Sequence, residues 1–495
     1  MLFLAKTATD TVNLAIRKCV TSSSGLRTIK SWAGDRTACF SDQCVTADGV
    51  ERGLLTVNRQ LPGPPIQVCV NDIVMVGVSN HMDGTSTTIH WHGMTQKQTP
   101  FSDGVPFITQ CPIHYGKTFR YTFKANDAGT NFYHSHSGLH KVDGIYGAKI
   151  VRIPDESKLH NHDTHDFILV VSDWMHEYAE QFFPELPNRL SLYKSVLING
   201  RGVYFEVRSK EAANKYTESP LVVYNVRENT NYRFRLINAA SNVCSFALKI
   251  EGHNFTVIAS DGSTFSPRNV DMLQFTSGER YDFIVETNQE PRDYWIQVKA
   301  FAPCQKYQGS AVLRYTKDKA SATLDFDDMK AFSLFDSVVT ASTTKNQTKC
   351  MPGTEFCRCV HRIKVKRHSV VDLLLIDIDD SQTHPFHMHG HKFYVMDMGN
   401  LNASVTCDDI RKHGIPLKKS HNKRPIHKDT VLVPNKGYVR LRFRADNPGF
   451  WMAHCHFEWH LAIGMGFIIQ VGELDEMPKP PENFTKCHDY FPHEM

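Results

Sequence analysis

Hydrophobic and polar residues alternate along several short stretches of the chain. The clearest stretch runs from 119 to 124, where aromatic residues at odd positions are separated by polar residues. The same period of two recurs at 66–70, 232–236 and 439–444, and every second position of the last stretch is an arginine. Successive side chains of a β-strand point to opposite faces, so each stretch predicts a strand with one buried face. Because Gly, Pro and Asn separate these stretches and few segments show a helical period, we predict an all-β chain of sandwiches or barrels.

Chain length and polar stretches indicate how the chain is divided. Its 495 residues correspond to about three domains of ordinary size. Polar stretches at 155–166 and 317–328 mark the expected boundaries, and the first 38 residues, which show little periodicity, are interpreted as a polar arm. The segments 252–257 and 390–395 share four of six residues, which indicates repeated domains. We therefore predict an N-terminal arm at 1–38 and domains at 39–160, 161–325 and 326–495.

Composition, net charge and the length of apolar runs limit the kinds of partner that we expect for this chain. With 41% hydrophobic and 22% charged residues, the composition is ordinary for a soluble globular protein. The net charge of +4 is small and dispersed, which does not favour nucleic-acid binding. No apolar run reaches the roughly 18 residues that a membrane-spanning helix needs. We therefore expect neither nucleic acid nor a membrane span.

Cysteines and glycosylation sequons indicate a secreted protein. Setting Cys455 aside as a candidate metal ligand leaves an even number of the 13 cysteines, which is compatible with disulfides. Three of them lie at 340–359, a segment interpreted as a stapled loop. Lys6 and Asp10 interrupt the apolar start, so either a leader is absent from this chain or secretion is unconventional. Sequons begin at Asn254, Asn346, Asn402 and Asn483.

Histidine pairs are the strongest chemical signal in the chain. Residues i and i+2 of a strand share a face, so a His-x-His pair can present two imidazoles to one cavity. A single pair is a weak indication of a metal site, but four pairs together indicate a metal cluster. Structural zinc is a poorer interpretation, because it needs four ligands and gains nothing from eight imidazoles. The pairs are His90 and His92, His134 and His136, His387 and His389, and His454 and His456.

The segment 451–465 adds two kinds of sulfur to the imidazoles. Cys455, His460 and Met465 offer a thiolate, an imidazole and a thioether. These are most of the ligands of a blue copper site, which has two histidines, one cysteine and a weak axial methionine. On an extended backbone the histidines on either side of Cys455 point away from it, toward a second metal site. One tripeptide would then connect two copper centres through covalent bonds.

These motifs together resemble the multicopper oxidases, and most of all the insect laccases. The resemblance rests on His-Trp-His-Gly from residue 90, His-Ser-His from 134, His-Pro-x-His-x-His-Gly-His from 384 and His-Cys-His-x3-His-x4-Met from 454. Segments 44–49, 58–64 and 198–202 also look insect-type, and the resemblance extends from about residue 39 to the C-terminus. It implies three cupredoxin-like Greek-key β-sandwich domains, with the first and third domains meeting at the metal cluster.

The resemblance also implies four copper ions and assigns ligands to each. Type 1 copper would be bound by His384, Cys455 and His460, with Met465 as the axial ligand. Type 2 copper would be bound by His90 and His387. One type 3 ion would be bound by His92, His134 and His456, and the other by His136, His389 and His454. The middle domain would line the substrate pocket and provide no ligand, so His253 is interpreted as a packed core residue.

The activity implied is that of a laccase, which oxidises phenols and catechols one electron at a time and reduces dioxygen to water with four. Cys455, His454, His456 and His460 would carry the electrons. Asp103 matches a carboxylate that laccases place beside the cluster, where oxygen reduction consumes protons; its alternative interpretation is a turn residue. An axial methionine stabilises Cu(II), which favours a low-to-moderate potential suited to electron-rich catechols. Glu458 is expected to be solvent-exposed.

Three alternative functions remain open. A ferroxidase would need acidic residues beside the type 1 histidines, and an ascorbate oxidase would need a pocket for an anionic reductant. A non-catalytic extracellular copper-binding protein would not need a cysteine between two cluster histidines, so 454–456 argues against it. We expect a secreted monomer whose partners are a phenolic small molecule and dioxygen.

Overall fold

The computed structural model describes residues 3–4, 11–20, 45–159, 161–163, 165–183, 192–206, 215–217, 219–242, 244–301, 304, 306–316, 361–377, 382–401 and 425–487. The predicted stapled loop at 340–359, the boundary stretch at 317–328 and the sequons at Asn346 and Asn402 lie outside the described residues. No helix within these ranges is long and apolar enough to cross a membrane.

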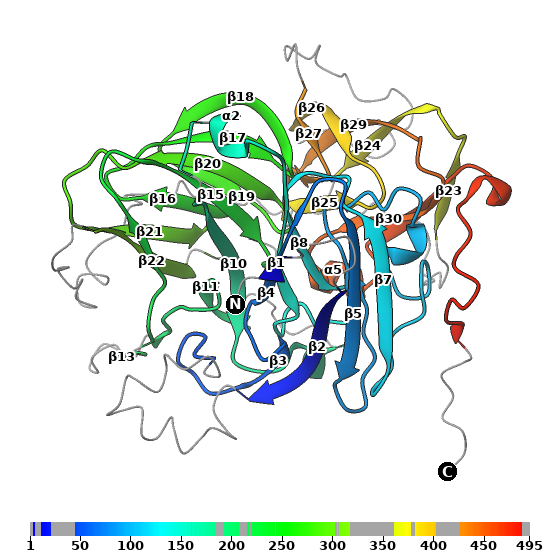
Figure 1. Cartoon of the computed structure of the whole chain (residues 1–495), viewed down its shortest axis with the longest axis horizontal. Helices are drawn as coiled ribbons and strands as arrows, with labels where there is room; N and C mark the ends of the chain where they lie inside the picture. Colours follow the sequence, from blue (N-terminus) through cyan, green and yellow to red (C-terminus); the bar gives the residue numbers. More distant parts are fainter. Residues whose placement is uncertain are drawn as a thin grey trace.

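Three β-sandwiches of two sheets each follow one another along the chain (Figure 1). Hydrogen bonds connect every pair of sandwiches, because Arg280 of the middle one bonds to Thr130 and Asp429, and Asn447 of the third bonds to Thr95 of the first. The prediction of an all-β chain is confirmed. The helical segments of the described residues are short: η2 (Pro100–Ser102), α2 (Glu156–Leu159), η3 (Ala179–Phe182), α5 (Glu458–Ala462) and η5 (Leu474–Glu476).

The first sandwich packs a sheet of order β3-β2-β5-β7 against a sheet of order β1-β4-β9-β8-β6. In β7 the residues Phe119, Tyr121 and Phe123 are buried and the positions between them face outward, as the alternation predicts. The strands are β1 (Phe3–Leu4), β2 (Thr11–Val20), β3 (Gly53–Val57), β4 (Gly63–Cys69), β5 (Ile73–His81), β6 (Ile89–His90), β7 (Thr118–Lys124), β8 (Gly129–Ser135) and β9 (Tyr146–Arg152).

Strand β2 corrects the interpretation of the first 38 residues as a polar arm. It pairs antiparallel with β3 and parallel with β5, so residues 11–20 form an inner strand of the first sandwich. The local sequence carries the signal, because Val12, Leu14 and Ile16 occupy every second position. The polar residues on both sides conceal this short alternation. The arm interpretation is therefore wrong for this segment.

The middle sandwich packs a sheet of order β11-β10-β15-β20-β17-β18 against one of order β14-β22-β21-β16-β19, with a small ribbon β12-β13 beside them. Its strands are β10 (Phe167–Met175), β11 (Tyr193–Ile198), β12 (Phe205–Glu206), β13 (Lys215–Tyr216), β14 (Val223–Val226), β15 (Asn231–Asn238), β16 (Phe246–Ile250), β17 (Phe255–Ser260), β18 (Ser263–Val270), β19 (Leu273–Phe275), β20 (Arg280–Glu286), β21 (Asp293–Ala300) and β22 (Gln308–Tyr315). Its hydrophobic core extends to Cys455 and Phe457, so the segment that carries the predicted copper thiolate is packed against this sandwich.

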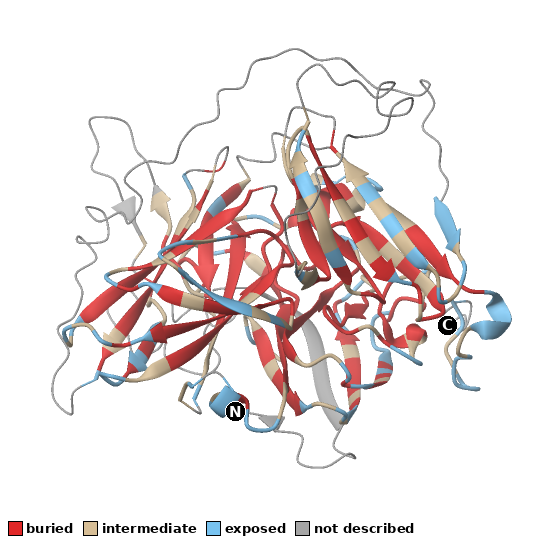
Figure 2. Ribbon diagram, turned by 90° about the horizontal axis from the view of Figure 1, so that it is seen from above, coloured by how far each residue is buried: buried red, intermediate tan, exposed pale blue. Residues whose placement is uncertain are grey.

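The third sandwich packs a sheet of order β23-β31-β30-β25-β28 against one of order β24-β29-β26-β27. Its strands are β23 (Arg362–Val365), β24 (Val370–Ile376), β25 (His384–Met388), β26 (Phe393–Asn400), β27 (His427–Lys428), β28 (Thr430–Val433), β29 (Gly437–Arg444), β30 (Gly449–Cys455) and β31 (Gly466–Val471). The buried residues of all three sandwiches line their facing sheets and continue across the junctions between them (Figure 2).

The repeated motif seen in the sequence occupies equivalent places in the middle and third sandwiches. His253 precedes β17 and His391 precedes β26, and both histidines are buried. Each strand then shifts its register against its antiparallel neighbour, after Val257 in β17 and after Val395 in β26. The shared bulge supports the interpretation of these segments as counterparts in repeated domains.

Two disulfides are formed by described residues. Cys244 and Cys304 are joined within the middle sandwich. Cys111 of the first sandwich is joined to Cys487, 376 residues further along the chain. Phe484, just before this bond, packs against Phe101 and Phe119, so the C-terminal segment is anchored on the first sandwich. Cys69 is exposed and has no disulfide partner in the described part of the chain.

Candidate metal centre

Each His-x-His pair lies at the end of a strand, and strand register brings the pairs together. His90 at the end of β6 is the direct partner of His134 on β8. In the third sandwich His387 on β25 is the direct partner of His454 on β30. The second histidine of each pair lies at position i+2, in the loop just beyond the strand. Backbone hydrogen bonds fix this register, so the ladders themselves align two pairs in each sandwich.

The first and third sandwiches bring the four pairs into one buried cluster. All eight imidazoles are buried. Two imidazole nitrogens bound to one ion at about 2.0 Å would lie about 3 Å apart, so the spacing observed fits shared metal ions. Distances of 3.1–3.4 Å between ring nitrogens cross the interface at His90 and His387, His92 and His456, and His136 and His454.

The outer nitrogen of most rings is held by a hydrogen bond, which leaves the inner nitrogen free to bind a metal. Nδ1 of four rings donates to a backbone carbonyl 2.8–2.9 Å away, in His90, His134, His387 and His454. His92 has the opposite orientation, with Nε2 beside Thr430 and Nδ1 facing His456. Nε2 of His134 is buried without a hydrogen-bond partner among the described groups, which is consistent with a metal ligand.

Burial also sets the protonation of the cluster. Desolvation lowers the pKa of seven of these imidazoles, which keeps them neutral with a lone pair available for a metal ion. They are His92, His134, His136, His387, His389, His454 and His456. The structure therefore brings the eight predicted histidines together, and burial favours the neutral, metal-binding form of these seven.

Asp103 lies beside this cluster, as expected, and also in a turn. Its Oδ2 accepts a hydrogen bond from Nδ1 of His389 at 2.8 Å, and its carbonyl accepts one from His90. Burial acts to raise the pKa of Asp103, but the imidazoles of His389 and His90 outweigh it and hold the pKa well below its usual value. Asp103 also follows η2 and precedes Gly104, so the turn interpretation holds at the same time.

A second, smaller set contains the thiol. Nδ1 of His384 lies 3.7 Å from Sγ of Cys455, Nδ1 of His460 lies 3.5 Å from it, and the two ring nitrogens are 3.2 Å apart. Burial raises the pKa of the Cys455 thiol to about 12, so a thiolate there needs a bound cation to stabilise it. Met465 is adjacent through its backbone, which bonds to Cys455 and His460, and its side chain is 38% exposed. Its role as axial ligand stays a prediction.

Glu458 is not exposed, so that expectation is wrong. Its side chain is buried at the start of α5 and forms an ion pair of 2.8 Å with Lys141 of the first sandwich. Nζ of Lys141 is also 3.3 Å from Nδ1 of His456. Burial raises the pKa of Glu458, and the charge of Lys141 opposes this rise. As a charged residue, Glu458 was expected to lie on the surface, but the first sandwich covers it.

Several residues that hold the ligands could not be recognised from the sequence. Oγ of Ser277 lies 2.9 Å from Nδ1 of His456. Oδ1 of Asp429 lies 3.3 Å from Nε2 of His92, and Arg280 forms an ion pair with the same carboxylate. Burial acts to raise the pKa of Asp429, but Arg280 holds it well below its usual value. These residues lie in unrelated parts of the chain and form no motif.

His253 of the middle sandwich was predicted to be a packed core residue. This histidine is buried, and its Nε2 lies 2.7 Å from the hydroxyl of Tyr315, so it is a packed core residue.

A cavity of about 390 Å³ lies where the three sandwiches meet. Its lining is mostly apolar, with Val105, Leu139, Phe183 and Leu461, and it includes His136 and Glu180.

Known proteins resemble this chain over most of its length. Three family models described as multicopper oxidase match residues 39–156, 165–318 and 330–475. Laccase-1 of Fomitopsis schrenkii is 31% identical, with 90% of this chain and 89% of the relative covered. The L-ascorbate oxidase of Nicotiana tabacum is 29% identical over 89% of this chain and 90% of the relative.

The fold is likewise found in solved structures. Fet3p, a multicopper oxidase that functions in iron import, superposes with a TM-score of 0.70 and 23% identity, over 96% of this chain and 93% of Fet3p. This confirms three cupredoxin-like sandwiches. With the family matches and the two buried ligand sets, it follows that the chain belongs to the multicopper oxidase family of copper-binding oxidoreductases.

Proposed function

We propose that the chain is a laccase-type oxidase, which couples one-electron oxidation of phenols and catechols to four-electron reduction of dioxygen to water. The observation that carries this proposal is the tripeptide 454–456, in which Cys455 belongs to the thiol set while His454 and His456 belong to the imidazole cluster. A protein that only stores copper has no need for a covalent connection of this kind between two ligand sets.

The proposed copper content is one type 1, one type 2 and two type 3 ions. Bound there, copper would accept single electrons at the thiol set and deliver them to dioxygen at the imidazole cluster. The spacings of the ligand atoms support these sets: His384, Cys455 and His460 for type 1; His90 and His387 for type 2; His92, His134 and His456, and His136, His389 and His454, for the type 3 ions. Met465 is the proposed axial ligand of the type 1 ion.

The surface beside the thiol set favours an aromatic reductant. His460 lies on α5, and the residues that follow this helix are apolar and open to solvent. The side chains of Ile463 and Met465 are 55% and 38% exposed. An aromatic ring can pack on such a rim, whereas a hydrated metal ion or an anion gains little from it.

At the imidazole cluster, Asp103 and the cavity serve the oxygen side of the reaction. Asp103 would stand as a carboxylate in the route by which protons reach the cluster, because its Oδ2 accepts a hydrogen bond from His389 and its Oδ1 lies 3.3 Å from Nδ1 of His90. The mostly apolar cavity that reaches His136 would admit dioxygen, which is apolar and needs no polar partner. Cys455 would provide the electron route between the two ligand sets.

A ferroxidase is the second candidate, and one contact favours it. Oδ2 of Asp377 lies 3.9 Å from Nε2 of His384, so a carboxylate stands beside a proposed type 1 ligand. Oxygen uptake measured with catechol, Fe(II) and ascorbate in turn separates the candidates. A laccase turns over catechol fastest and keeps that activity in Asp377→Asn, whereas a ferroxidase loses most of its Fe(II) oxidation in this variant. Fast ascorbate oxidation would point to the third possibility.

The Cys455→Ser variant tests the electron route itself. Serine removes the soft sulfur ligand, so we expect loss of the blue absorption and of catechol turnover. Copper in the imidazole cluster should remain. Turnover retained at the parental rate would refute the proposed route.

We also propose that the protein is secreted and monomeric. The two disulfides support an oxidising compartment, and Asn254 and Asn483 are exposed sequon positions. Deglycosylation of the protein purified from its native source should lower its mass, and light scattering should give the mass of one chain.

A further inference from the structure

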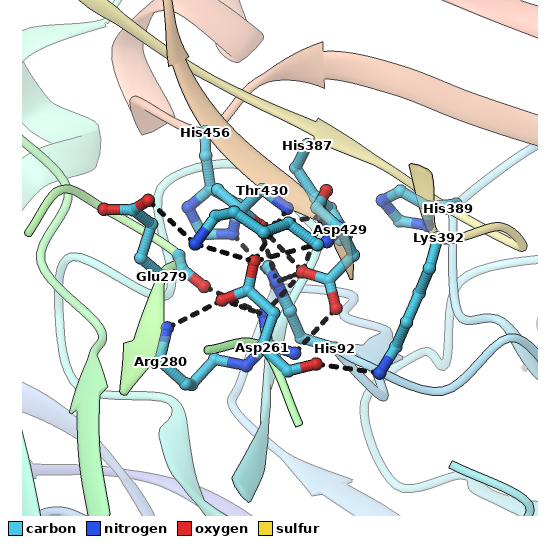
Figure 3. A network of polar contacts seen from close by, with 12 residues as sticks. His92, Asp261, Glu279, Arg280, His387, His389, Lys392, Asp429, Thr430 and His456 are labelled. Carbon is cyan, nitrogen blue, oxygen red and sulfur yellow. Dashed lines mark hydrogen bonds and ion pairs between the residues drawn. The ribbon is translucent and has the colours of Figure 1, made fainter. Parts of the chain in front are cut away.

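We propose that Arg280 of the middle sandwich is a positioning residue for the imidazole cluster, although in the described structure no hydrogen bond or ion pair joins it to a proposed copper ligand. The inference rests on the proposed copper sets and deepens them. It assigns to the middle sandwich a role in oxygen reduction, through a buried contact with Asp429 of the third sandwich (Figure 3).

Arg280 is fully buried and uses its whole guanidinium group. Both terminal nitrogens bond to the carboxylate of Asp429, at 2.5 and 2.6 Å. Nε bonds to the carbonyl of Thr130 at 3.2 Å, and Nη2 also bonds to Oδ1 of Asn131 at 3.3 Å. Nη1 also donates to the carbonyl of Gly278 at 3.1 Å. One side chain therefore fixes the middle sandwich to both of the others.

The segment that contains Asp429 is held on the middle sandwich at several further points. Oδ2 of Asp261 accepts hydrogen bonds from the backbone N–H groups of Asp429 and Thr430, each at 3.2 Å. Nζ of Lys428 forms ion pairs with Asp261 at 3.3 Å and with Glu279 at 3.1 Å. Figure 3 shows Asp261, Glu279 and Arg280 gathered around this segment. Residues 428–430 therefore take their position from the middle sandwich.

The same segment orients two imidazoles of the cluster. The carbonyl of Asp429 accepts a hydrogen bond of 2.9 Å from Nδ1 of His387. Oδ1 of Asp429 and Oγ1 of Thr430 lie 3.3 and 3.1 Å from Nε2 of His92. His92 belongs to the first sandwich and His387 to the third, so the segment fixes the angle between rings from two domains.

The planar fork of arginine is what this contact requires. A guanidinium group can bind both oxygens of a carboxylate at once, whereas a lysine ammonium is a point charge without that geometry. Lysine at this position keeps the positive charge but frees the carboxylate of Asp429 to rotate. The rings of His92 and His387 then lose their fixed orientation.

The test compares Arg280→Lys with Arg233→Lys in the copper-loaded protein. Arg233 is a buried arginine of the same sheet, paired with Glu156 and Asp282, and among the described residues it forms no hydrogen bond or ion pair with residues 428–430. The measurements are copper per chain, the blue absorption, the electron paramagnetic resonance spectrum of the imidazole-bound copper, and kcat and KM for catechol.

For Arg280→Lys we expect unchanged blue absorption and KM, an altered resonance spectrum, and a loss of roughly 10- to 100-fold in kcat or in affinity for the cluster copper. For Arg233→Lys we expect a lower melting temperature with parental copper content and spectrum. A parental spectrum and copper content in Arg280→Lys would overturn the proposal.

A second variant covers the case in which Arg280→Lys does not fold. Asp429→Asn keeps the backbone carbonyl that binds His387 but removes one charge from the pair, and it should change the same spectrum. Unchanged copper and spectrum in this variant would also contradict the positioning role. If the parent protein oxidises none of the three reductants, the proposed activity fails, while copper content and the spectrum still test Arg280.

Discussion

Asp103 is the residue for which position and proposed chemistry are most closely joined. Its Oδ2 orients His389, and its Oδ1 lies 3.3 Å from Nδ1 of His90, so both carboxylate oxygens face the cluster. Asparagine can keep the hydrogen bond through its amide oxygen but cannot carry a proton. We expect Asp103→Asn to bind copper normally and to be reduced by catechol at the parental rate, while steady-state oxygen uptake falls by roughly 10²- to 10⁴-fold. Anaerobic stopped-flow reduction and oxygen uptake measure the two halves; equal steady-state rates would contradict a proton role.

Lys149 is a buried amine whose loss of hydration is only partly compensated. It lies on β9, is fully buried, and has no hydrogen-bond partner among the described groups. Its Nζ lies 5.3 Å from the ring of Phe123. Desolvation lowers the pKa of Lys149 from 10.5 to about 7, and the nearby charge of Asp127 opposes this only in part. Above pH 7 the folded protein therefore holds a mostly neutral amine, which takes up a proton when the chain unfolds.

This proton uptake fixes the sign of a pH effect. Between pH 7 and 10.5 the unfolded state binds the extra proton, so the parent gains stability as the pH rises, by up to about 1.4 kcal/mol per unit. Lys149→Met should remove this slope and raise the melting temperature most near pH 7. Melting curves of both proteins at several pH values in this window measure the difference. Lys124→Met, at an exposed position of β7, is the control, and a pH-independent difference for Lys149→Met would disprove the idea.

At the scale of elements, the turn after η2 positions part of the cluster. Gly104 has φ of +86°, and a Cβ atom there would lie 1.9 Å from the carbonyl oxygen of Ile89. The turn thus presses against the residue just before His90, and only glycine allows this approach. This close approach of Gly104 to Ile89 also places the neighbouring Asp103 beside His90 and His389.

Gly104→Ala should therefore disturb both stability and the site. The left-handed conformation alone costs about 1–2 kcal/mol, and the clash adds to it. Gly84→Ala is a matched control, because Gly84 has φ of +67° but no atom within 4 Å of its Cβ position. We expect a clearly larger drop in melting temperature for Gly104→Ala, with slower oxygen uptake. Equal drops in the two variants would show that the close approach is unimportant.

At the scale of the whole molecule, the cluster depends on the contact between the first and third sandwiches. The cluster takes two histidine pairs from each of them, and the bond between Cys111 and Cys487 ties the end of the chain to the first. Separation of the two sandwiches would divide the ligands of every proposed cluster ion.

Removal of this disulfide should weaken both the fold and copper retention. For the variant Cys111→Ala with Cys487→Ala we expect a loss of roughly 2–5 kcal/mol of stability, seen as a lower melting temperature. Cluster copper should also leave faster in the presence of a chelator. Cys244→Ala with Cys304→Ala removes the bond inside the middle sandwich and should lower stability without faster copper loss. Identical copper loss in the two double variants would contradict a role of the Cys111–Cys487 bond in copper retention.

Features that depend on neighbours in sequence could be predicted from the sequence alone. The alternation at 119–124 and 439–444 predicted β7 and β29, because the side-chain period of a strand is a local property. The histidine pairs and Cys455 could be recognised in the same way, since imidazole and thiolate side chains at this spacing suit soft metal ions. The short strand β2 was missed only because polar residues surround it.

The tertiary structure alone decided which distant charged groups support the site. Glu458 is buried because Lys141, more than 300 residues away in sequence, reaches it across the interface. Arg280 reaches Asp429 only because the end of one sheet packs against another domain. A single charged residue looks the same in sequence whether it faces water or a buried partner. Its role is fixed by which strand ends meet, and that is determined by the packing of whole sandwiches rather than by any local pattern.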